Sequence, residues 1–387
     1  MKNIYLDNNS TTPVLPEVAR AMAECYALGL ANPASAHQPG QQARRVLEDT
    51  RERIGRILGA DVTTSAADRV IFTSGATEAN NLALRGLAGS PGHAIVSSIE
   101  HPSVLGPAGW LKQQGWRVDY LGVSGDGVVW VDQLADMLRE DTRLVSVMLG
   151  NNETGVLQPI TRIAAICRQA GVPLHSDASQ VVGKLPVHFG ELGVDALTAT
   201  AHKFHGPRGI GVLVVKADLP LRPILFGGFQ QGSLRPGTES IAPAVGMLAA
   251  LELWAADPDA RAAQLTELRD SLEVALLAGW PELVINGCGA PRLPHTSNVS
   301  FPGLDRQAIL MGLDVAGVAA STGSTCASGS SEPSPVLLAM GCDKRVVDGS
   351  LRLSVGATTT AQDVEVGAKR ILEVANGLSG GPRRSSG

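Results

Sequence analysis

Residues 195–215 read DALTATAHKFHGPRGIGVLVV, and this stretch decides the fold. Small and apolar residues predict a buried strand that ends near Lys203, and a glycine-rich segment follows it. A buried lysine amine shifts readily in pKa and suits Schiff-base chemistry, but a lone lysine at a strand end is more often solvated. Lys203 therefore needs partners elsewhere in the chain before it indicates a function.

Segments on either side alternate between strand-like and helix-like patterns. Residues 94–99 (AIVSSI), 144–149 (LVSVML) and 172–177 (VPLHSD) are short apolar runs that end in polar residues, as buried parallel strands do. Residues 43–59 (ARRVLEDTRERIGRILG) carry apolar side chains at helical spacing and end in glycine. Alternating strands and helices predict an α/β sheet, whose ligand site lies at the carboxyl ends of its strands.

Asp177 and Gln180 follow one of these predicted strands. A carboxylate that faces a pyridine nitrogen keeps it protonated, which makes the ring an electron sink. A strand-end Asp is also a common helix N-cap. Gln180 has two interpretations as well, a contact to a ring hydroxyl or a helix cap. With Lys203 in the same chain, we favour a functional role for both.

Residues 70–86 (VIFTSGATEANNLALRG) read as strand, glycine turn and helix. Gly75, Ala76 and Thr77 then present N–H groups at a helix N-terminus, which favours a phosphate, although a plain capped helix fits too. His101 lies at another predicted strand end, in SSIEHPSV. An imidazole there can stack on a ring and move protons, but a lone histidine is usually structural.

Composition narrows the class of protein. The 387 residues are 44% hydrophobic and 18% charged with a formal charge of −5, so we expect an ordinary globular protein that does not bind nucleic acid. The N-terminus lacks a secretory apolar run and no stretch is long enough to span a bilayer, so we expect a cytoplasmic protein without membrane contact. No Cys-x-x-Cys pair or metal-ligand spacing occurs, which indicates free thiols and no metal site at Cys25, Cys167, Cys288, Cys326 and Cys342.

Motifs that occur in order along most of the chain resemble one family. They are YLDNNSTTP, SGATEANN, IEHPSV, GNNETG, SDASQ, TAHKFHGPRGIG, LRPGTE, STGSTCASGSSEPSPVL and LRLSVG. Together they resemble the cysteine desulfurases of the NifS/IscS type, within the class V aminotransferases. The resemblance implies an α/β fold of the pyridoxal-phosphate (PLP)-dependent transferase type, fold type I, with a mostly parallel sheet in a large domain and a smaller α+β domain.

The composition change near Asp257-Pro258 places the domain boundary. We expect residues 15–256 to form the large PLP-binding domain. Residues 1–14 and 257–376 then form the small domain, which carries the Cys326 loop. Residues 377–387 (GLSGGPRRSSG) are rich in glycine and serine, which predicts a disordered tail.

The resemblance also implies a role for individual residues. Lys203 corresponds to the lysine that binds PLP, Asp177 to the partner of the ring nitrogen, and Gln180 to the contact of the ring oxygen. His101 corresponds to the ring-stacking histidine and is the expected proton acceptor for the attacking thiol. The phosphate-side contacts are Ala76, Thr77, Thr200 and His202.

The resemblance assigns the substrate contacts and a dimer as well. Asn152 corresponds to a contact near the ring or the substrate carboxylate, and Arg352 to the carboxylate clamp, since a guanidinium is bidentate. A surface arginine on a strand is the alternative for Arg352. Thr238 corresponds to a residue that reaches the phosphate of the other subunit, which implies a homodimer. Phe229 and Gln231 depart from the family's glycine and glutamate, so substrate access or dimer contacts are expected to differ.

Cys326 distinguishes the possible activities. It lies in a segment rich in Gly, Ser and Pro, which predicts a mobile loop rather than a core position. The resemblance implies that its thiolate takes sulfur from L-cysteine as a persulfide, leaving L-alanine. It also implies transfer to a sulfur-acceptor or iron–sulfur scaffold protein, for cluster assembly or for thiolation of other cofactors and tRNA. A transient iron–sulfur cluster on Cys326 is compatible with it. The alternatives are a selenocysteine lyase, another class V PLP enzyme, or a non-enzymatic PLP-binding scaffold.

Overall fold

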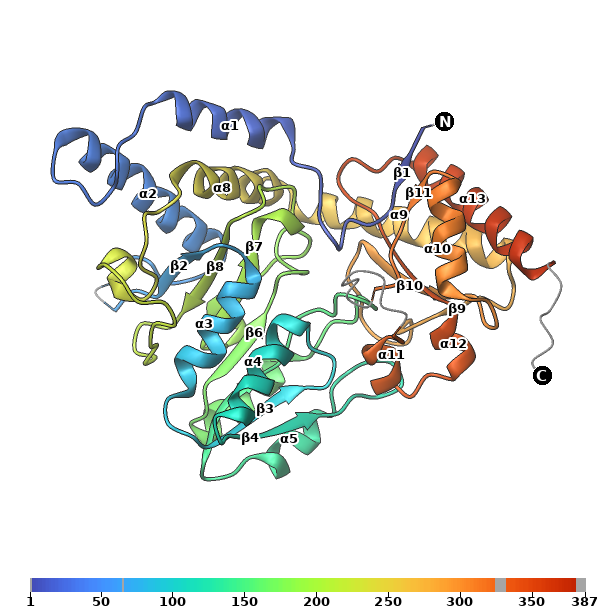
Figure 1. Ribbon diagram of the computed structural model, residues 1–387, viewed down its shortest axis with the longest axis horizontal. Coiled ribbons are helices and arrows are strands. Elements are labelled where there is room, and N and C mark those ends of the chain that lie inside the picture. Colours follow the sequence, from blue (N-terminus) through green and yellow to red (C-terminus); the bar gives the residue numbers. More distant parts are fainter. Residues whose placement is uncertain (1, 65, 324–331, 381–387) are drawn as a thin grey trace.

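The computed structural model describes residues 2–64, 66–323 and 332–380 of the chain. Its larger part is built on a seven-stranded sheet (Figure 1), with the strand order β2-β8-β7-β6-β5-β3-β4. Only β8 runs antiparallel to its neighbours among these strands, so the predicted mostly parallel sheet is confirmed. The strands are β2 Arg69–Thr73, β3 His93–Ser97, β4 Arg117–Leu121, β5 Thr142–Ser146, β6 Leu174–Asp177, β7 Ala196–Thr200 and β8 Gly211–Val215.

Helices cover both faces of this sheet, as the alternation of side chains along the strands requires. In β8, Val212 and Val214 join the core under α2, α6 and α8, whereas Leu213 and Val215 join the core under α3 and α4. Strands that are buried on both faces must be apolar throughout, and GVLVV is. The helices of this part are α1 Pro16–Ala27, α2 Gln38–Ile57, α3 Ala76–Ala88, α4 Pro102–Gln113, α5 Val131–Met137, α6 Ile160–Ala170, α7 Phe189–Leu192 and α8 Ile241–Ala255.

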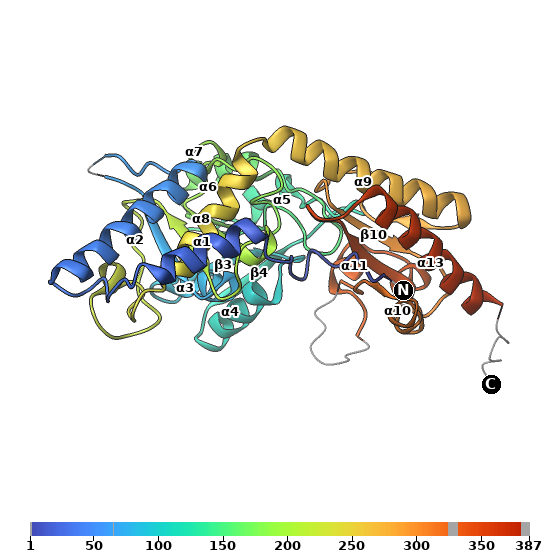
Figure 2. The same cartoon turned by 90° about the horizontal axis from the view of Figure 1, so that it is seen from above.

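A second core gathers side chains from both ends of the chain. Ile4 and Leu6 pack with residues of α9, α10 and α13 around an antiparallel sheet of order β12-β10-β9, and β1 pairs with β11. Figure 2 shows α9 and α13 at one end of the molecule and α1 and α2 at the other. The elements are β1 Ile4–Tyr5, α9 Pro258–Gly279, β9 Val284–Ile285, β10 Thr296–Ser300, α10 Arg306–Val315, β11 Val318–Ala319, α11 Pro335–Ala339, α12 Lys344–Asp348, β12 Ser350–Ser354 and α13 Ala361–Ser379. The limits of the two predicted domains stay a prediction.

Two expectations about element ends were wrong. The helix α13 continues through residues 377–379, where the sequence predicted a disordered tail, because Thr360 and Asp363 cap its start and Ile371 and Ala375 anchor it in the core. The strands predicted to reach residues 99 and 149 end at Ser97 and Ser146. The chain leaves the sheet there to form loops at its carboxyl edge, which is where the candidate site lies. Residues 381–387 lie outside the described part of the chain.

None of the described helices is both long and apolar enough to cross a membrane.

Candidate active site

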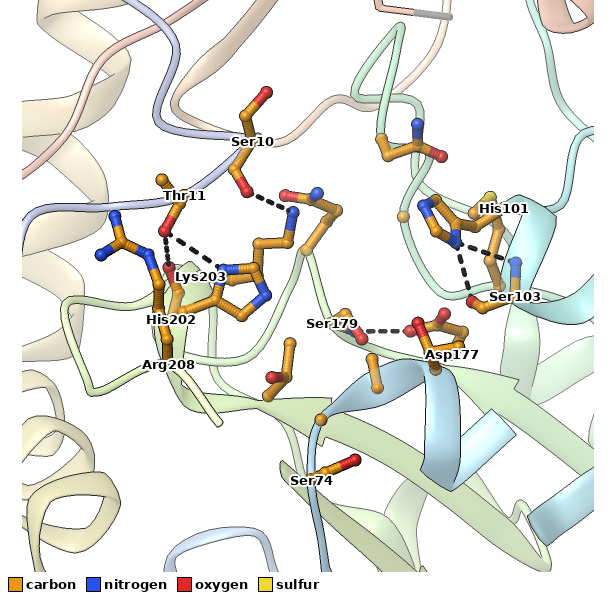
Figure 3. Close-up of a pocket in the computed structure, with 18 of the residues that line it drawn as sticks. Ser10, Thr11, Ser74, His101, Ser103, Asp177, Ser179, His202, Lys203 and Arg208 are labelled. Carbon is orange, nitrogen blue, oxygen red and sulfur yellow. Dashed lines mark hydrogen bonds between the residues drawn. The ribbon is translucent and has the colours of Figure 1, made fainter. Parts of the chain in front are cut away.

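A cavity of about 490 Å³ lies at the carboxyl ends of the central strands. Figure 3 shows side chains from segments far apart in the sequence, among them Ser10, His101, Asp177 and Lys203, gathered around it. The structure brings together nine residues that the sequence singled out: Ala76, Thr77, His101, Asn152, Asp177, Gln180, Thr200, His202 and Lys203. They come from several different predicted strand ends and turns, so their convergence follows from the parallel order of the sheet.

Lys203 ends a single 3-10 turn, η1 Ala201–Lys203, directly after β7. Its Nζ donates hydrogen bonds to the backbone carbonyls of Asn9 and Ser10, the second at 2.9 Å. Burial and, after it, the positive charge of Arg352 lower the pKa of Lys203 to about 8, while Asp177 acts in the opposite direction. An amine with such a pKa is a far better nucleophile near neutral pH than a solvated lysine.

Asp177 ends β6 and is buried beneath the cavity. Its Oδ2 accepts a hydrogen bond from Asn80 Nδ2 at 2.6 Å, and its Oδ1 accepts one from the backbone N–H of Ser179 at 2.9 Å. The residues after it form turns rather than an α-helix, so the alternative of a helix N-cap is wrong. The carboxylate is held from two sides beside the cavity.

Gln180 presents a buried acceptor that no described residue satisfies. Its Nε2 donates to the Asn9 carbonyl at 3.1 Å, whereas its Oε1 has no partner. A buried carbonyl oxygen without a donor costs about 1–3 kcal/mol, so this atom calls for a donor within the cavity. A ring hydroxyl of the kind that PLP carries fits this requirement.

The start of α3 provides the anion cradle. Gly75 lies at φ 153°, a conformation that side-chain-bearing residues rarely adopt, and α3 begins at Ala76. The N–H groups of the first helical turn have no partner within the helix, so they are available to a phosphate. Arg208, which the sequence analysis missed, lines the same cavity and adds a positive charge.

Thr200 and His202, which the sequence predicted to contact a phosphate, line the same cavity. Thr200 Oγ1 donates to the Ile210 carbonyl at 3.1 Å, and His202 Nδ1 lies 3.2 Å from Thr11 Oγ1. Burial lowers the pKa of His202 to about 4, and Lys203 contributes to the same direction. His202 is therefore a neutral hydrogen-bonding group near pH 7.

His101 lies on the other side of the cavity, at the N-cap of α4. Its Nδ1 accepts a hydrogen bond from the backbone N–H of Ser103 at 3.1 Å and lies 2.7 Å from Ser103 Oγ. Burial lowers the pKa of His101, and Lys203 and Arg352 add to this effect while Asp177 opposes it. The imidazole is thus neutral and faces the cavity (Figure 3).

Arg352 is buried, so the alternative of a surface arginine is wrong. It lies on β12 and lines an adjoining cavity of about 340 Å³ that also contacts His101, Asn152 and Lys203. Its guanidinium donates to the Asn152 carbonyl at 3.0 Å and to Ser10 Oγ at 2.7 Å. Its Nε is buried without a partner among the described residues. A carboxylate in this second cavity would meet a fixed guanidinium, which suits a clamp.

Among the described residues, Thr238 is the predicted site residue that lines neither of these two cavities. Thr238 is exposed and lines a separate surface pocket beside Tyr26. Cys326 lies outside the described residues, so its role stays a prediction. Phe229 and Gln231 do not line the Lys203 cavity either, which argues against the expectation that they alter substrate access within one chain. Among the described residues, no group of three His, Cys, Asp or Glu side chains could hold a metal ion.

The sequence analysis missed the residues that support the predicted ones. Asn80 gave a weak signal, since it is an amide on the otherwise apolar buried face of α3. Ser103 follows His101 by two residues and gave no signal of its own. The N-terminal segment supplies Asp7, Asn9 and Ser10, and its contacts to residues nearly 200 or more positions away could not be read from local patterns.

The chain was then compared with known proteins. The family model described as "Aminotransferase class-V" matches residues 4–366. The chain is 40% identical to a cysteine desulfurase IscS of Dictyoglomus turgidum, over 94% of this chain and 92% of the relative. It is 38% identical to an IscS-like cysteine desulfurase of Mycobacterium tuberculosis, over 99% and 98%.

Solved structures agree with these relatives. A NifS-like protein superposes with a TM-score of 0.88 at 33% identity, covering 97% of this chain and 100% of the other. A structure titled "SspA in complex with cysteine" superposes with a TM-score of 0.80 at 30% identity, covering 92% and 100%.

Proposed function

The chain belongs to the class V aminotransferase family, and from that premise we propose that it is a PLP-dependent cysteine desulfurase, which converts L-cysteine to L-alanine and retains the sulfur. One observation carries the proposal. A single cavity collects an amine of lowered pKa on Lys203, a fixed carboxylate on Asp177 and an unsatisfied acceptor on Gln180, and Arg352 adjoins it. This combination fits a pyridine ring with an aldehyde, a hydroxyl and a bound amino acid.

Each of these residues would contact a different part of the cofactor. Lys203 would bind the aldehyde carbon, Asp177 would face the ring nitrogen, and Gln180 would contact the ring hydroxyl. The N-terminus of α3, with Thr77, Thr200 and His202, would hold the phosphate. When bound, PLP supplies an electron sink that stabilises negative charge on the substrate carbon.

Substrate orientation is the task of Arg352 and Asn152. The guanidinium is fixed by its bonds to Asp7, Ser10 and the Asn152 carbonyl, so it loses little freedom when it binds a carboxylate. The substrate carboxylate at Arg352 leaves its Cα within the region between Lys203 and His101, which both line the adjoining cavity. Lys203 then moves the Cα proton, since its pKa of about 8 leaves a substantial neutral fraction of the amine near that pH.

Sulfur transfer is assigned to Cys326. Its thiolate attacks the substrate sulfur, a new S–S bond forms, and the substrate C–S bond breaks with its electron pair remaining on carbon. Protonation of that carbon yields alanine, and the sulfur stays on Cys326 as a persulfide. The nucleophile is the thiolate, so the thiol proton must leave first. A sulfur-acceptor or iron–sulfur scaffold protein would then take the sulfur, and the cytoplasm is the proposed compartment.

We extend the proposal to a homodimer. Thr238 is exposed and lies outside the cavity of its own chain, which suits a residue that serves a partner's phosphate. The nearby Phe226 and Phe229 are 88% and 91% exposed, and large apolar side chains that exposed favour contact with another surface.

The experiment that tests the activity supplies purified protein with L-cysteine and a reductant. A desulfurase releases alanine and sulfide in equal amounts. A selenocysteine lyase would act on selenocysteine but not on cysteine, an aminotransferase would yield a keto acid in place of alanine, and a PLP-binding scaffold would yield neither product.

A further inference from the structure

A chain of hydrogen bonds links His101 to Asp177, two residues that line the candidate site. Asn80 Nδ2 lies 2.6 Å from Asp177 Oδ2 and 2.8 Å from Ser103 Oγ, and Ser103 Oγ lies 2.7 Å from His101 Nδ1. Asn80 is fully buried in α3, and Ser103 is buried in the first turn of α4. Figure 3 shows the two ends of this hydrogen-bond network, His101 with Ser103 and Asp177, on the same side of the cavity.

The direction of each bond follows from the chemistry of the groups. An ionised carboxylate only accepts hydrogen bonds, so the Asn80 atom that faces Asp177 is its NH₂ group. The second N–H of that group donates to Ser103 Oγ, which leaves the Ser103 hydroxyl hydrogen for His101 Nδ1. The backbone N–H of Ser103 points at the same nitrogen, at 3.1 Å. His101 Nδ1 therefore meets two donors and cannot carry a hydrogen itself.

We propose that Asn80 and Ser103 are positioning residues that hold His101 in the tautomer protonated at Nε2 and couple it to Asp177. His101 then presents an N–H donor to the cavity rather than a free lone pair. This replaces the expectation that His101 accepts the thiol proton, because in the neutral ring the accepting nitrogen is Nδ1, which is occupied. The tautomer of His101 follows from these hydrogen bonds alone, whereas the role of its N–H donor in the reaction rests on the proposed function.

The charges around His101 agree with a neutral ring. Lys203 after β7 and Arg352 on β12 both disfavour an imidazolium, and Asp177 on β6 favours one. Glu100, the preceding residue, is fully buried, and burial raises its pKa to about 8, so this carboxyl group is also neutral at pH 7. A charged His101 would lose the hydrogen bond that Nδ1 accepts from the Ser103 backbone N–H, as well as hydration, so the network and the burial act in the same direction.

The network also orients both ends of the site at once. Asn80 uses both of its N–H donors in this network of hydrogen bonds. A displacement of Asp177 would therefore move the Ser103 hydroxyl and, through it, the His101 imidazole. Asn80 Oδ1 is buried without a partner among the described residues, so the amide contributes hydrogen bonds here through its two N–H donors alone. Burial of the unsatisfied oxygen is unfavourable, and the bonds of the two donors must offset this cost.

Solid-state NMR of histidine-¹⁵N-labelled full-length protein tests this, with PLP bound and after its removal. The chain has eight histidines, and His101→Gln assigns the His101 signals by their loss. The wild type should show His101 protonated at Nε2. Ser103→Ala and Asn80→Ala should each raise the pKa of His101 by about half to one pH unit, the effect of one neutral hydrogen bond. The double variant should show the same shift as Ser103→Ala alone, because Asn80 acts through Ser103.

Two controls make the outcome specific. Ser179→Ala removes a hydroxyl that lines the same cavity and has no partner among the described residues, so the pKa of His101 should not move. Ser103→Thr keeps the hydroxyl and should restore wild-type behaviour. A wild-type His101 protonated at Nδ1, or shifts in Ser103→Ala and Asn80→Ala no larger than in Ser179→Ala, would overturn the proposal, as would additive shifts in the double variant. Neither outcome depends on alanine release, so a failure here is separable from a failure of the proposed function.

Discussion

Arg352 Nη2 lies 2.9 Å from Asp7 Oδ1, in an ion pair between residues 345 positions apart. The pair joins β12 to the N-terminal segment, which runs from the second core toward α1 (Figure 1). The same segment supplies the Asn9 carbonyl that accepts from both Gln180 and Lys203. The proposed carboxylate clamp and the proposed PLP lysine are thus tied to one short stretch of chain.

Substitution of Arg352 by lysine should weaken cysteine binding. An ammonium group keeps the positive charge but cannot replace the planar guanidinium, whose several N–H donors bind Asp7, Ser10 and a substrate carboxylate at the same time. We expect KM for cysteine to rise about 10- to 100-fold, with a smaller change in kcat. Arg345→Lys, at an exposed position, is the matched control and should leave KM unchanged. Equal KM values in the two variants would remove Arg352 from the substrate site.

The rate of PLP uptake by the apoprotein should rise with pH and level off above about 8. Burial lowers the pKa of Lys203 to about 8, and only the neutral amine reacts with an aldehyde, so the reactive fraction grows as the pH passes through this value. Arg352 lowers this pKa too, so Arg352→Gln should move the curve to higher pH. Stopped-flow absorbance measures the rate of PLP uptake. Reduction with borohydride followed by peptide mapping identifies the lysine to which the cofactor is attached. Cofactor fixed to another lysine, or a curve centred near 10, would contradict the assignment.

Local patterns predicted the strands and turns around the site and, with them, most of the cavity lining, although two predicted strands extended past their true ends at Ser97 and Ser146. Asp177 ends a buried strand, Lys203 and His101 follow buried strands, and a parallel sheet brings such ends together without further information. The roles of Thr238 and Cys326 were assigned from the family resemblance alone. Both roles stay predictions, since Thr238 lies away from the site of its own chain and Cys326 lies outside the described residues.

The sequence did not predict the residues whose hydrogen bonds hold the site residues in position. Asn80, Ser103 and Asp7 bind their partners through contacts between segments that are distant in sequence, the nearest pair of segments being α3 and α4. Hydrogen-bond networks of this kind depend on side-chain positions of a few tenths of an ångström, which no periodicity encodes. The prediction of a disordered tail was wrong at residues 377–379 for a related reason, since their glycine and serine content does not reveal that they end a helix that tertiary packing stabilises.

Gln231→Ala should destabilise the protein. The Gln231 amide pairs with the edge strand β2 as another strand would: its Oε1 accepts from Phe72 N at 2.7 Å and its Nε2 donates to Phe72 O at 2.8 Å. Gln231 also adopts φ 49°, a backbone conformation that these bonds offset. Loss of the pair should cost about 1–3 kcal/mol of unfolding free energy, measured by urea denaturation. Gln133→Ala, on the exposed face of α5, is the control, and equal losses in both would mean that the pairing contributes nothing.

Thr238 should serve the partner subunit. Subunits that carry Lys203→Ala lack the PLP lysine, and subunits that carry Thr238→Ala lack the phosphate contact, so each homodimer should be impaired. A mixed dimer restores one intact site, because that site takes Lys203 from one chain and Thr238 from the other. Equal mixing after dissociation should recover about a quarter of wild-type turnover, since half of the dimers are mixed and each has one intact site. No recovery on mixing, or a fully active monomer in sedimentation, would refute the shared site.

The most direct measurement concerns Cys326. Wild-type protein that is given L-cysteine without a reductant should gain one sulfur, and mass spectrometry should locate it on the peptide that contains Cys326. The buried Cys25 and Cys167 should stay unmodified, since burial raises the pKa of each thiol, that of Cys167 to about 12. The Cys326→Ser protein should still bind PLP but should release no alanine from cysteine, because a hydroxyl cannot take up sulfur as a persulfide. Alanine release by Cys326→Ser at the wild-type rate would contradict the account.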